Sequence, residues 1–123
     1  MAGEDQLFQR FGREFRKGHV LFREGEPGRE MFVVQSGKVN ITKTVRETEK
    51  ILATLGPGEF FGEMSLLDGE PRSATVRAET DMRLLVILRR NFQTLLTEVP
   101  ELTRNILIVL SRRLREIERT LNA

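Results

Sequence analysis

Short apolar runs separated by glycine and turn residues fill the middle of the chain, and this pattern strongly limits what the chain can fold into. Between residues 13 and 88 the runs are Val20–Phe22, Met31–Val34, Val39–Val45, Ile51–Leu55, Ala74–Ala78 and Leu84–Leu88. Runs of this length are too short for stable helices, whereas they match strands bounded by turns. We therefore predict a mainly β fold, an antiparallel jelly-roll-like β-roll flanked by helices.

The turns between these runs carry signals of their own. Proline followed by glycine occurs in Gly25–Gly28 and in Leu55–Glu59. Proline favours extended backbone in the residue before it, and the glycine after it supplies a positive φ. Ser36–Lys38, with glycine at its centre, predicts a tight hairpin between the second and third runs. The polar residues 46–49 predict the loop of the next hairpin.

Helical periodicity occurs near the two ends of the chain. Gln6–Phe11 predicts a short amphipathic helix, which Gly12 stops. Asn91–Val99 predicts a second short helix. Pro100 ends that helix and suits the first turn of a long helix over Glu101–Leu121.

The length of the chain, 123 residues, suits one domain with a single modest core. We expect that domain to span residues 1–123. Its parts are an N-terminal helix (1–12), the β-roll (13–88) and the C-terminal helices (89–123).

The long C-terminal helix carries two apolar stripes. The first, formed by Leu102, Ile106 and Val109, suits packing against the β-roll. The second has the alternating spacing of three and four residues that forms a coiled-coil seam, and it consists of Leu107, Leu110, Leu114, Ile117 and Leu121. Two hypotheses stay open for this stripe: a homodimer through the seam, or a single helix lying in a groove of its own domain.

Composition argues against several classes of function. The chain has no cysteine and one histidine, His19, so thiolate catalysis and zinc sites built from Cys or His lack their ligands. A metal-dependent phosphodiesterase would need a cluster of His and Asp, and Ser73 has no nearby histidine to activate it. There is no Walker or dinucleotide-binding glycine motif. We therefore expect a binding protein that is not an enzyme and uses no metal or cofactor.

The charge and the hydropathy of the sequence predict a soluble protein. The formal net charge is +2, from 20 basic and 18 acidic residues that alternate along most of the sequence, which argues against nucleic-acid binding by this chain alone. The arginines of the last helix are interrupted by Glu116 and Glu118 and suit a solvated face. No apolar stretch is long enough to span a bilayer, and the first ten residues lack the apolar run of a signal peptide. We expect a cytoplasmic location.

The segment richest in chemistry is Phe61–Thr75, with the sequence F-G-E-M-S-L-L-D-G-E-P-R-S-A-T. Glu63 and Arg72 flank a short apolar run and a turn. A guanidinium forks onto phosphate oxygens, a carboxylate accepts from a sugar hydroxyl, and N–H groups at a helix N-terminus receive negative charge. Together they suit a cyclic phosphate joined to a ribose. The alternative for Glu63 and Arg72 is an ion pair that pins a loop.

These residues resemble the cyclic nucleotide-binding domain family, which includes catabolite activator-type transcription factors, regulatory subunits of cyclic AMP-dependent kinase and gates of cyclic nucleotide-regulated channels. The resemblance rests on F-G-E-x-S-L, five further residues and R-S-A-T-V-R-A, and on the segment Leu21–Gly37, L-F-R-E-G-E-P-G-R-E-M-F-V-V-Q-S-G. Phe22 departs from the pattern, because a smaller aliphatic residue is more usual there.

The resemblance implies roles for individual residues. Glu63 is expected to accept a hydrogen bond from the ribose 2′-OH, and Arg72 to contact the cyclic phosphate. Main-chain N–H groups of Gly62, Ser73 and Ala74 are expected to add donors. The full set of expected ligand-binding residues is Gly62, Glu63, Met64, Ser65, Arg72, Ser73 and Ala74.

Side chains of the same segment also have packing interpretations. We expect Met64, Leu66 and Leu67 to be core residues of the short helix in this segment. Ser73, directly after the arginine, permits either cyclic AMP or cyclic GMP, and we place cyclic AMP first.

The resemblance also implies a switch, in which the C-terminal helix closes over the base as a lid and controls an attached or partner effector. The candidate lid residues are Arg115, Ile117, Arg119 and Leu121. The alternative hypothesis is the dimerising sensor part of a catabolite activator-like transcription regulator, lacking its DNA-binding part.

Overall fold

The computed structural model describes residues 8–122. The chain divides into two compact units, Met1–Arg89 and Arg90–Ala123, and each is described by itself. The first unit carries the strands, the helical residues 8–11 and one short internal helix, and the second carries most of the C-terminal helical part.

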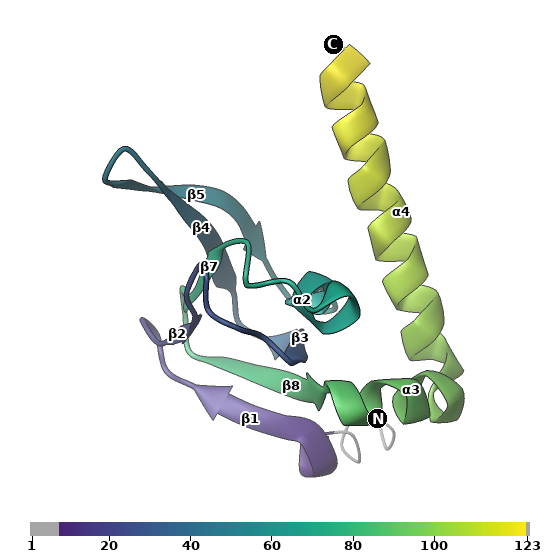
Figure 1. Cartoon of the computed structure of the whole chain (residues 1–123). Helices are drawn as coiled ribbons and strands as arrows, with labels where there is room; N and C mark the ends of the chain where they lie inside the picture. The colour runs from purple at the N-terminus through teal and green to yellow at the C-terminus, as the bar shows by residue number, and fades with distance from the viewer. Residues whose placement is uncertain (1–7, 123) are drawn as a thin grey trace. The chain divides into compact units, whose positions relative to one another are not determined.

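Two antiparallel four-stranded sheets build the first unit (Figure 1). One sheet has, in spatial order, β1 (Gly12–Phe15), β8 (Met82–Leu88), β3 (Glu30–Ser36) and β6 (Phe60–Phe61). The other has β2 (Val20–Phe22), β7 (Thr75–Ala78), β4 (Val39–Val45) and β5 (Thr48–Leu55). The predicted antiparallel β-roll is confirmed. Sequence reasoning missed β1, which is polar, and β6, which has two residues.

One hydrophobic cluster belongs to both sheets. Its buried members are Phe32, Val34, Phe61, Met82 and Leu84 from one sheet and Val39, Leu55, Val76 and Ala78 from the other. Alternate residues of a strand point to opposite faces, so each sheet contributes every second side chain to this cluster. Removing this apolar surface from water stabilises the roll, at roughly 25 cal/mol per Å².

The predicted hairpin at Ser36–Lys38 is wrong. The strand β3 pairs with β8 and β6, whereas β4 pairs with β5 and β7, so this turn carries the chain from one sheet to the other. Gly37 has a φ of 87°, and a Cβ there would lie 2.4 Å from the carbonyl oxygen of Asp81. A local turn signal specifies a reversal of direction but not which strands pair afterwards.

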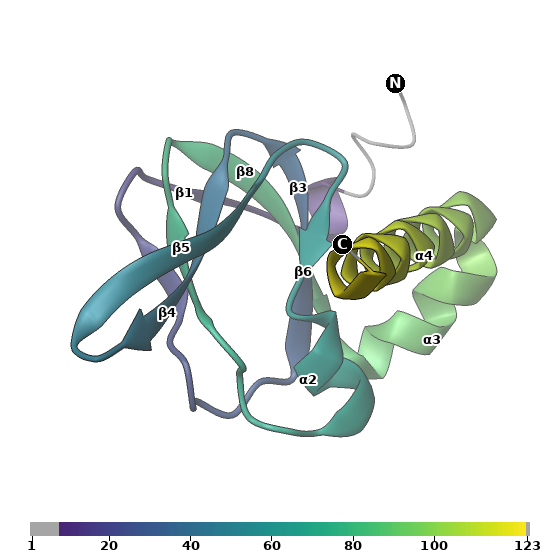
Figure 2. The same cartoon turned by 90° about the horizontal axis from the view of Figure 1, so that it is seen from above.

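The hairpin between β4 and β5 is confirmed and projects from the roll (Figure 2). Its turn is shorter than predicted, because Thr48 and Glu49 already belong to β5. Arg46 and Glu47 have φ values of 52° and 67°, the left-handed backbone that a two-residue hairpin turn requires.

The predicted helices are also present. Residues 8–11 are helical, and the rest of the helix predicted over Gln6–Phe11 lies outside the described residues. A short helix α2 spans Glu63–Asp68. In the C-terminal part, α3 spans Arg89–Glu98 and α4 spans Pro100–Asn122, with proline at the start as expected. Among the described residues, no helix has the length and apolar character needed to cross a membrane.

The second unit shows which faces of its helices are covered. Leu95 and Ile106 are buried, and the Thr103 hydroxyl donates to the Leu96 carbonyl at 3.0 Å, which ties α4 to α3. Four members of the predicted seam are exposed large apolar residues: Leu107, Leu114, Ile117 and Leu121.

Gly37→Ala is expected to destabilise the protein, because the new Cβ meets the Asp81 carbonyl and the backbone needs a left-handed φ. We expect the free energy of unfolding to fall by about 1–3 kcal/mol. Urea denaturation followed by circular dichroism measures it.

Gly56→Ala is the matched control. It lies in a turn, its backbone is not left-handed, and apart from its chain neighbours no atom of the described residues lies within 4 Å of a Cβ built there. We expect a change of at most about 0.5 kcal/mol. Equal losses in the two variants would show that the turn at residue 37 has no particular need for glycine.

Candidate functional site

The site is built where the segment after β6 passes next to the turn after β2. The main-chain N–H of Arg72 donates to the Glu26 carbonyl, and the N–H of Gly25 donates to the Arg72 carbonyl, each at 2.8 Å. These two hydrogen bonds fasten residue 72 to a turn that lies more than forty positions earlier in the sequence. The position of the arginine is therefore set by tertiary structure.

The guanidinium of Arg72 is buried, with its side chain only 1% exposed. Its Nη1 donates to the Gly62 carbonyl and its Nη2 donates to the Glu30 carbonyl, each at 2.9 Å. Nη2 also lies 3.6 Å from Oε1 of Glu30. Two main-chain carbonyls and one carboxylate therefore hold one edge of the cation.

The Nε–H of the guanidinium differs from these donors. Among the described residues, Nε of Arg72 is a buried side-chain nitrogen without a hydrogen-bond partner. A buried donor of this kind costs about 1–3 kcal/mol if it is left unsatisfied. An anionic oxygen is the chemical group that would satisfy it best.

Glycines leave the space that the guanidinium fills. A Cβ at Gly28 would lie 2.1 Å from Nε, and a Cβ at Gly62 would lie 2.8 Å from Nη1. Gly62 also has a left-handed φ of 83° at the start of α2. The positive φ expected at Gly28 is wrong, whereas that at Gly58 is confirmed at 87°. Glycine is needed at residue 28 because of the close approach of Arg72.

Two opposing effects act on the pKa of Arg72. Burial lowers the pKa of its guanidinium below the ordinary value, because desolvation disfavours the charged form. The carboxylates of Glu30, Glu26 and Glu63 oppose that shift. An additional anion near the guanidinium would compensate further for the lost hydration.

Glu63 is the first residue of α2 and is 6% exposed, so this predicted carboxylate lies inside the structure. Ser65 and Leu66 are buried on the same helix. The expectation that Met64 and Leu67 belong to the core is wrong, since they are 59% and 54% exposed. A helix of six residues has one buried face, and the 3.6-residue period turns Met64 and Leu67 away from it.

The last predicted residues follow Arg72 along the chain. Ser73 is exposed, and its carbonyl accepts from Nζ of Lys43 at 3.4 Å. Ala74 is buried at the start of the segment that becomes β7. The predicted residues therefore form two groups, one at the start of α2 (62–65) and one just before β7 (72–74). The hydrogen bond from Nη1 of Arg72 to the Gly62 carbonyl joins the two groups.

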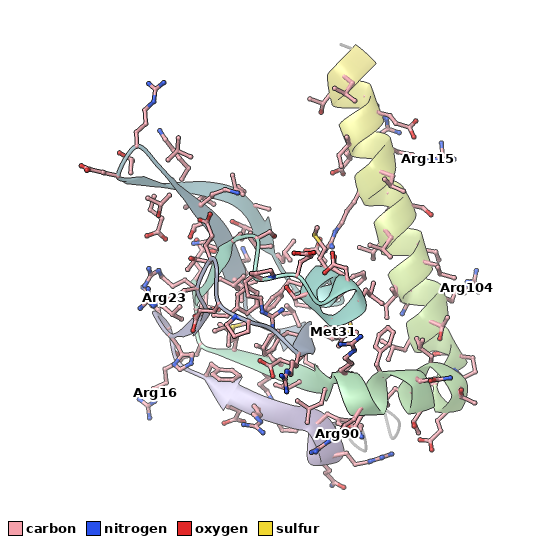
Figure 3. All side chains as sticks on the ribbon, viewed as in Figure 1. Arg16, Arg23, Met31, Arg90, Arg104 and Arg115 are labelled. Carbon is pink, nitrogen blue, oxygen red and sulfur yellow. The ribbon has the colours of Figure 1, made fainter. Side chains whose placement is uncertain are left out.

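The candidate lid residues on α4 are all exposed, but they do not share a face. Arg115 and Arg119 are four residues apart on one side, and Ile117 and Leu121 are on another, about 160° around the helix from them. Figure 3 shows Arg104 and Arg115 projecting from the same side of α4. Only one of these two pairs can therefore cover a given ligand at one time.

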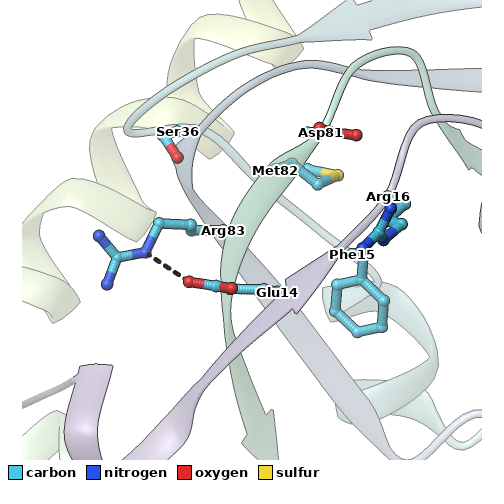
Figure 4. A pocket seen from close by; sticks show the side chains of 7 residues that line it. All are labelled: Glu14, Phe15, Arg16, Ser36, Asp81, Met82 and Arg83. Carbon is cyan, nitrogen blue, oxygen red and sulfur yellow. Dashed lines mark ion pairs between the residues drawn. The ribbon is translucent and has the colours of Figure 1, made fainter.

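A second feature of the first unit is an open hollow of about 540 Å³, drawn in Figure 4. Its charged residues include Glu14 and Arg83, whose side chains form an exposed ion pair at 3.8 Å, and Asp81, which accepts from the N–H of Lys17. None of the predicted site residues lines it. Among the described residues, no group of three His, Cys, Asp or Glu side chains is placed to hold a metal ion.

Sequence reasoning missed three residues that lie against the Arg72 guanidinium, which are Phe22, Gly28 and Glu30. The sequence marks Phe22 only as a departure from a pattern and Gly28 only as a turn residue, and it gives no signal for Glu30. All three lie in the segment Leu21–Gly37, so a search for contacts between that segment and Phe61–Thr75 could have found them.

Known proteins resemble this chain over most of its length. The family model described as the cyclic nucleotide-binding domain matches residues 12–99. The Cyclic AMP receptor protein of Thermus thermophilus is 42% identical over 112 residues, which cover 90% of this chain and 51% of that protein. A cyclic nucleotide-gated potassium channel of Mesorhizobium japonicum is 48% identical over 85 residues, which cover 69% of this chain and 22% of the channel.

The same likeness holds in three dimensions. The crystal structure of the Thermus thermophilus catabolite activator protein matches with a TM-score of 0.82 and 38% identity. The match covers 98% of this chain and 58% of that one. The chain therefore spans about half the length of the first of these relatives, and less of the channel.

Gly28→Ala is expected to displace the Arg72 guanidinium, because the new Cβ occupies the position next to Nε. We expect the free energy of unfolding to fall by about 1.5–3 kcal/mol, the range for hydrogen bonds to a charged group. We also expect the Nε–H signal of Arg72 in ¹⁵N NMR spectra to lose its protection from exchange with water.

The backbone at residue 28 is not left-handed, so this variant tests the contact and not the turn. Gly56→Ala again serves as the control and should leave the Arg72 signal unchanged. A structure of Gly28→Ala with the guanidinium unmoved would show that the close approach is unimportant.

Proposed function

Because the chain belongs to the cyclic nucleotide-binding domain family, we propose that it is a regulatory domain that binds a cyclic nucleotide at Phe61–Thr75. The observation that carries the proposal is the buried guanidinium of Arg72. Carbonyls hold it along one edge, and its Nε has no partner among the described residues. One fixed cation with a free donor suits the single negative charge of a cyclic phosphate.

The neighbouring residues supply the other contacts of the proposed site. Glu63, buried at the start of α2, would accept a hydrogen bond from the ribose 2′-OH. Main-chain N–H groups of Gly62, Ser73 and Ala74 would donate to the phosphate oxygens. Met64 and Ser65 complete the set on α2. No catalytic group and no metal is required, because binding alone changes the state of the protein.

We place cyclic AMP ahead of cyclic GMP as the ligand. The name of the Thermus thermophilus relative, Cyclic AMP receptor protein, supports this order. The name of the channel specifies only a cyclic nucleotide. In this chain Ser73 can accommodate either base. We therefore propose a higher affinity for cyclic AMP and not an exclusion of cyclic GMP.

The C-terminal helix is proposed to transmit binding. A ligand shifts an equilibrium only by its different affinity for the two states, so some part of α4 has to contact the bound nucleotide in one state and not in the other. Arg115 and Arg119 would stack on the base, or Ile117 and Leu121 would cover it. What α4 then controls is an effector, attached or separate. The proposal treats residues 1–123 as one non-catalytic cytoplasmic domain.

A second candidate is the dimerising sensor of a catabolite activator-like transcription regulator. The seam of α4 favours it, because four of its five members are exposed and Leu110 is partly exposed; the others are Leu107, Leu114, Ile117 and Leu121. Burying such a stripe against a second copy removes apolar surface from water. In that case Ile117 and Leu121 belong to the dimer, and the lid would use the other face, with Arg115 and Arg119.

Arg72→Ala is expected to weaken cyclic nucleotide binding by at least about 1.5–3 kcal/mol, because it removes a charge-assisted contact with the phosphate. Isothermal titration calorimetry with cyclic AMP and with cyclic GMP measures the affinities. Arg72→Lys should keep the charge and still bind more weakly, since an ammonium cannot reproduce the fork.

Arg77→Ala is the matched control. This arginine lies on β7 and is partly exposed. Its Nη2 lies 3.5 Å from Oε2 of Glu49, and neither residue belongs to the proposed site. We expect its affinity to equal that of the wild type. Wild-type protein that binds neither nucleotide would refute the proposal, as would Arg72→Ala that binds normally.

The seam makes a separate prediction about assembly. Sedimentation equilibrium is expected to show a dimer for the wild type and a monomer for Leu114→Asp, since a carboxylate in the seam would lose its hydration. Arg112→Asp, on the opposite face of α4, should remain a dimer. A wild-type monomer with and without nucleotide would reject the seam as an interface.

A further inference from the structure

The ring of Phe22 lies directly against the Arg72 guanidinium. The distance from Cζ of Arg72 to the ring centroid is 4.0 Å, whereas the centroid of Phe32 is 6.0 Å away. A cation over an aromatic face within about 6 Å is attracted by the ring quadrupole.

Phe22 is itself held firmly. Its ring lies 5.9 Å from that of Phe32 and 6.0 Å from that of Phe61, and it packs against the core cluster shared by the two sheets. Its backbone is in β2 and is paired with Val76 of β7. A ring fixed by two other rings and a sheet has little freedom to move away from the cation.

The contacts around the guanidinium fix different degrees of freedom. The Gly62 and Glu30 carbonyls accept from Nη1 and Nη2, and the Phe22 ring lies against Cζ at 4.0 Å. Gly28 leaves room at Nε. The competing anion is the Glu30 carboxylate, at 3.6 Å from Nη2. We expect that loss of the ring would leave the guanidinium freer to shift towards that carboxylate.

We propose that Phe22 is a positioning residue of the cyclic nucleotide site, whose aromatic face holds the Arg72 guanidinium in the orientation that receives the phosphate. The inference rests on the proposed function for the identity of the anion. Phe22 need not touch the ligand, since it acts through Arg72. An aliphatic residue would fill similar space but would not attract the cation.

The expected effect follows from preorganisation. An arginine that is already ordered loses little side-chain freedom when the ligand binds, whereas a mobile one loses more. Loss of the ring should therefore raise the dissociation constant about three- to tenfold.

The test separates ring electronics from packing. Phenylalanine analogues with increasing fluorination at residue 22 keep the shape of the ring and weaken its quadrupole. We expect the dissociation constant for cyclic AMP to rise with each fluorine, and to rise about three- to tenfold in Phe22→Leu. Phe22→Tyr, which keeps the aromatic face, should bind much as the wild type does.

Phe15→Leu is the control for a general loss of packing. Phe15 is also partly buried against the core cluster, and its ring contacts His19 at 4.9 Å. We expect it to lower stability without changing the dissociation constant. A constant that stays flat across the fluorinated series, or falls in Phe22→Leu, would overturn the role of Phe22.

A second readout needs no nucleotide. The Nε–H proton of Arg72 feels the ring current of Phe22, so its NMR signal should move and its exchange with water should accelerate in Phe22→Leu but not in Phe15→Leu. If the wild type bound neither nucleotide, the proposed function would fail while this readout still tested the contact. An unchanged Arg72 signal in Phe22→Leu would refute the positioning role in either case.

Discussion

Burying a guanidinium is the constraint on which the rest of this site depends. The Arg72 side chain is 1% exposed, and a cation removed from water needs hydrogen bonds and opposite charge in return. Hydrogen bonds come from the Gly62 and Glu30 carbonyls, and opposite charge comes from the Glu30 carboxylate. The face of the Phe22 ring adds a cation–π contact. The two glycines near the guanidinium follow from the same demand, because any side chain there would occupy its place.

The topology of the roll brings these groups together. Because β2 lies beside β7 and β3 beside β6, the turn between β2 and β3 meets both ends of the segment between β6 and β7. Two main-chain hydrogen bonds then join Arg72 to Gly25 and Glu26. The segment Phe61–Thr75 is therefore supported by an earlier part of the chain, which fixes the position of Arg72. A site built in this way suits recognition by preorganisation.

The C-terminal helix has two candidate roles, as a lid over a ligand and as the seam of a dimer. Its seam residues Ile117 and Leu121 lie on the side away from Arg115 and Arg119, so one side can serve a partner while the other serves a ligand. The relatives with which this chain shares its fold include a receptor protein and a potassium channel. Such different proteins can share a binding domain, because function outside the site depends on what the domain is joined to.

The sequence by itself predicted the β-roll and the flanking helices, and it singled out Glu63 and Arg72 as candidate site residues. Strand and helix periods are properties of the local sequence. The presence of an acid and an arginine in one short segment can likewise be read without knowledge of the fold. Only the tertiary structure decided that the turn at Gly37 crosses between sheets, and that Met64 and Leu67 face outwards. It alone decided that Phe22, Gly28 and Glu30 enclose Arg72. These contacts join residues more than forty positions apart, and strand pairing and burial, which create them, are properties of the whole roll and not of any segment.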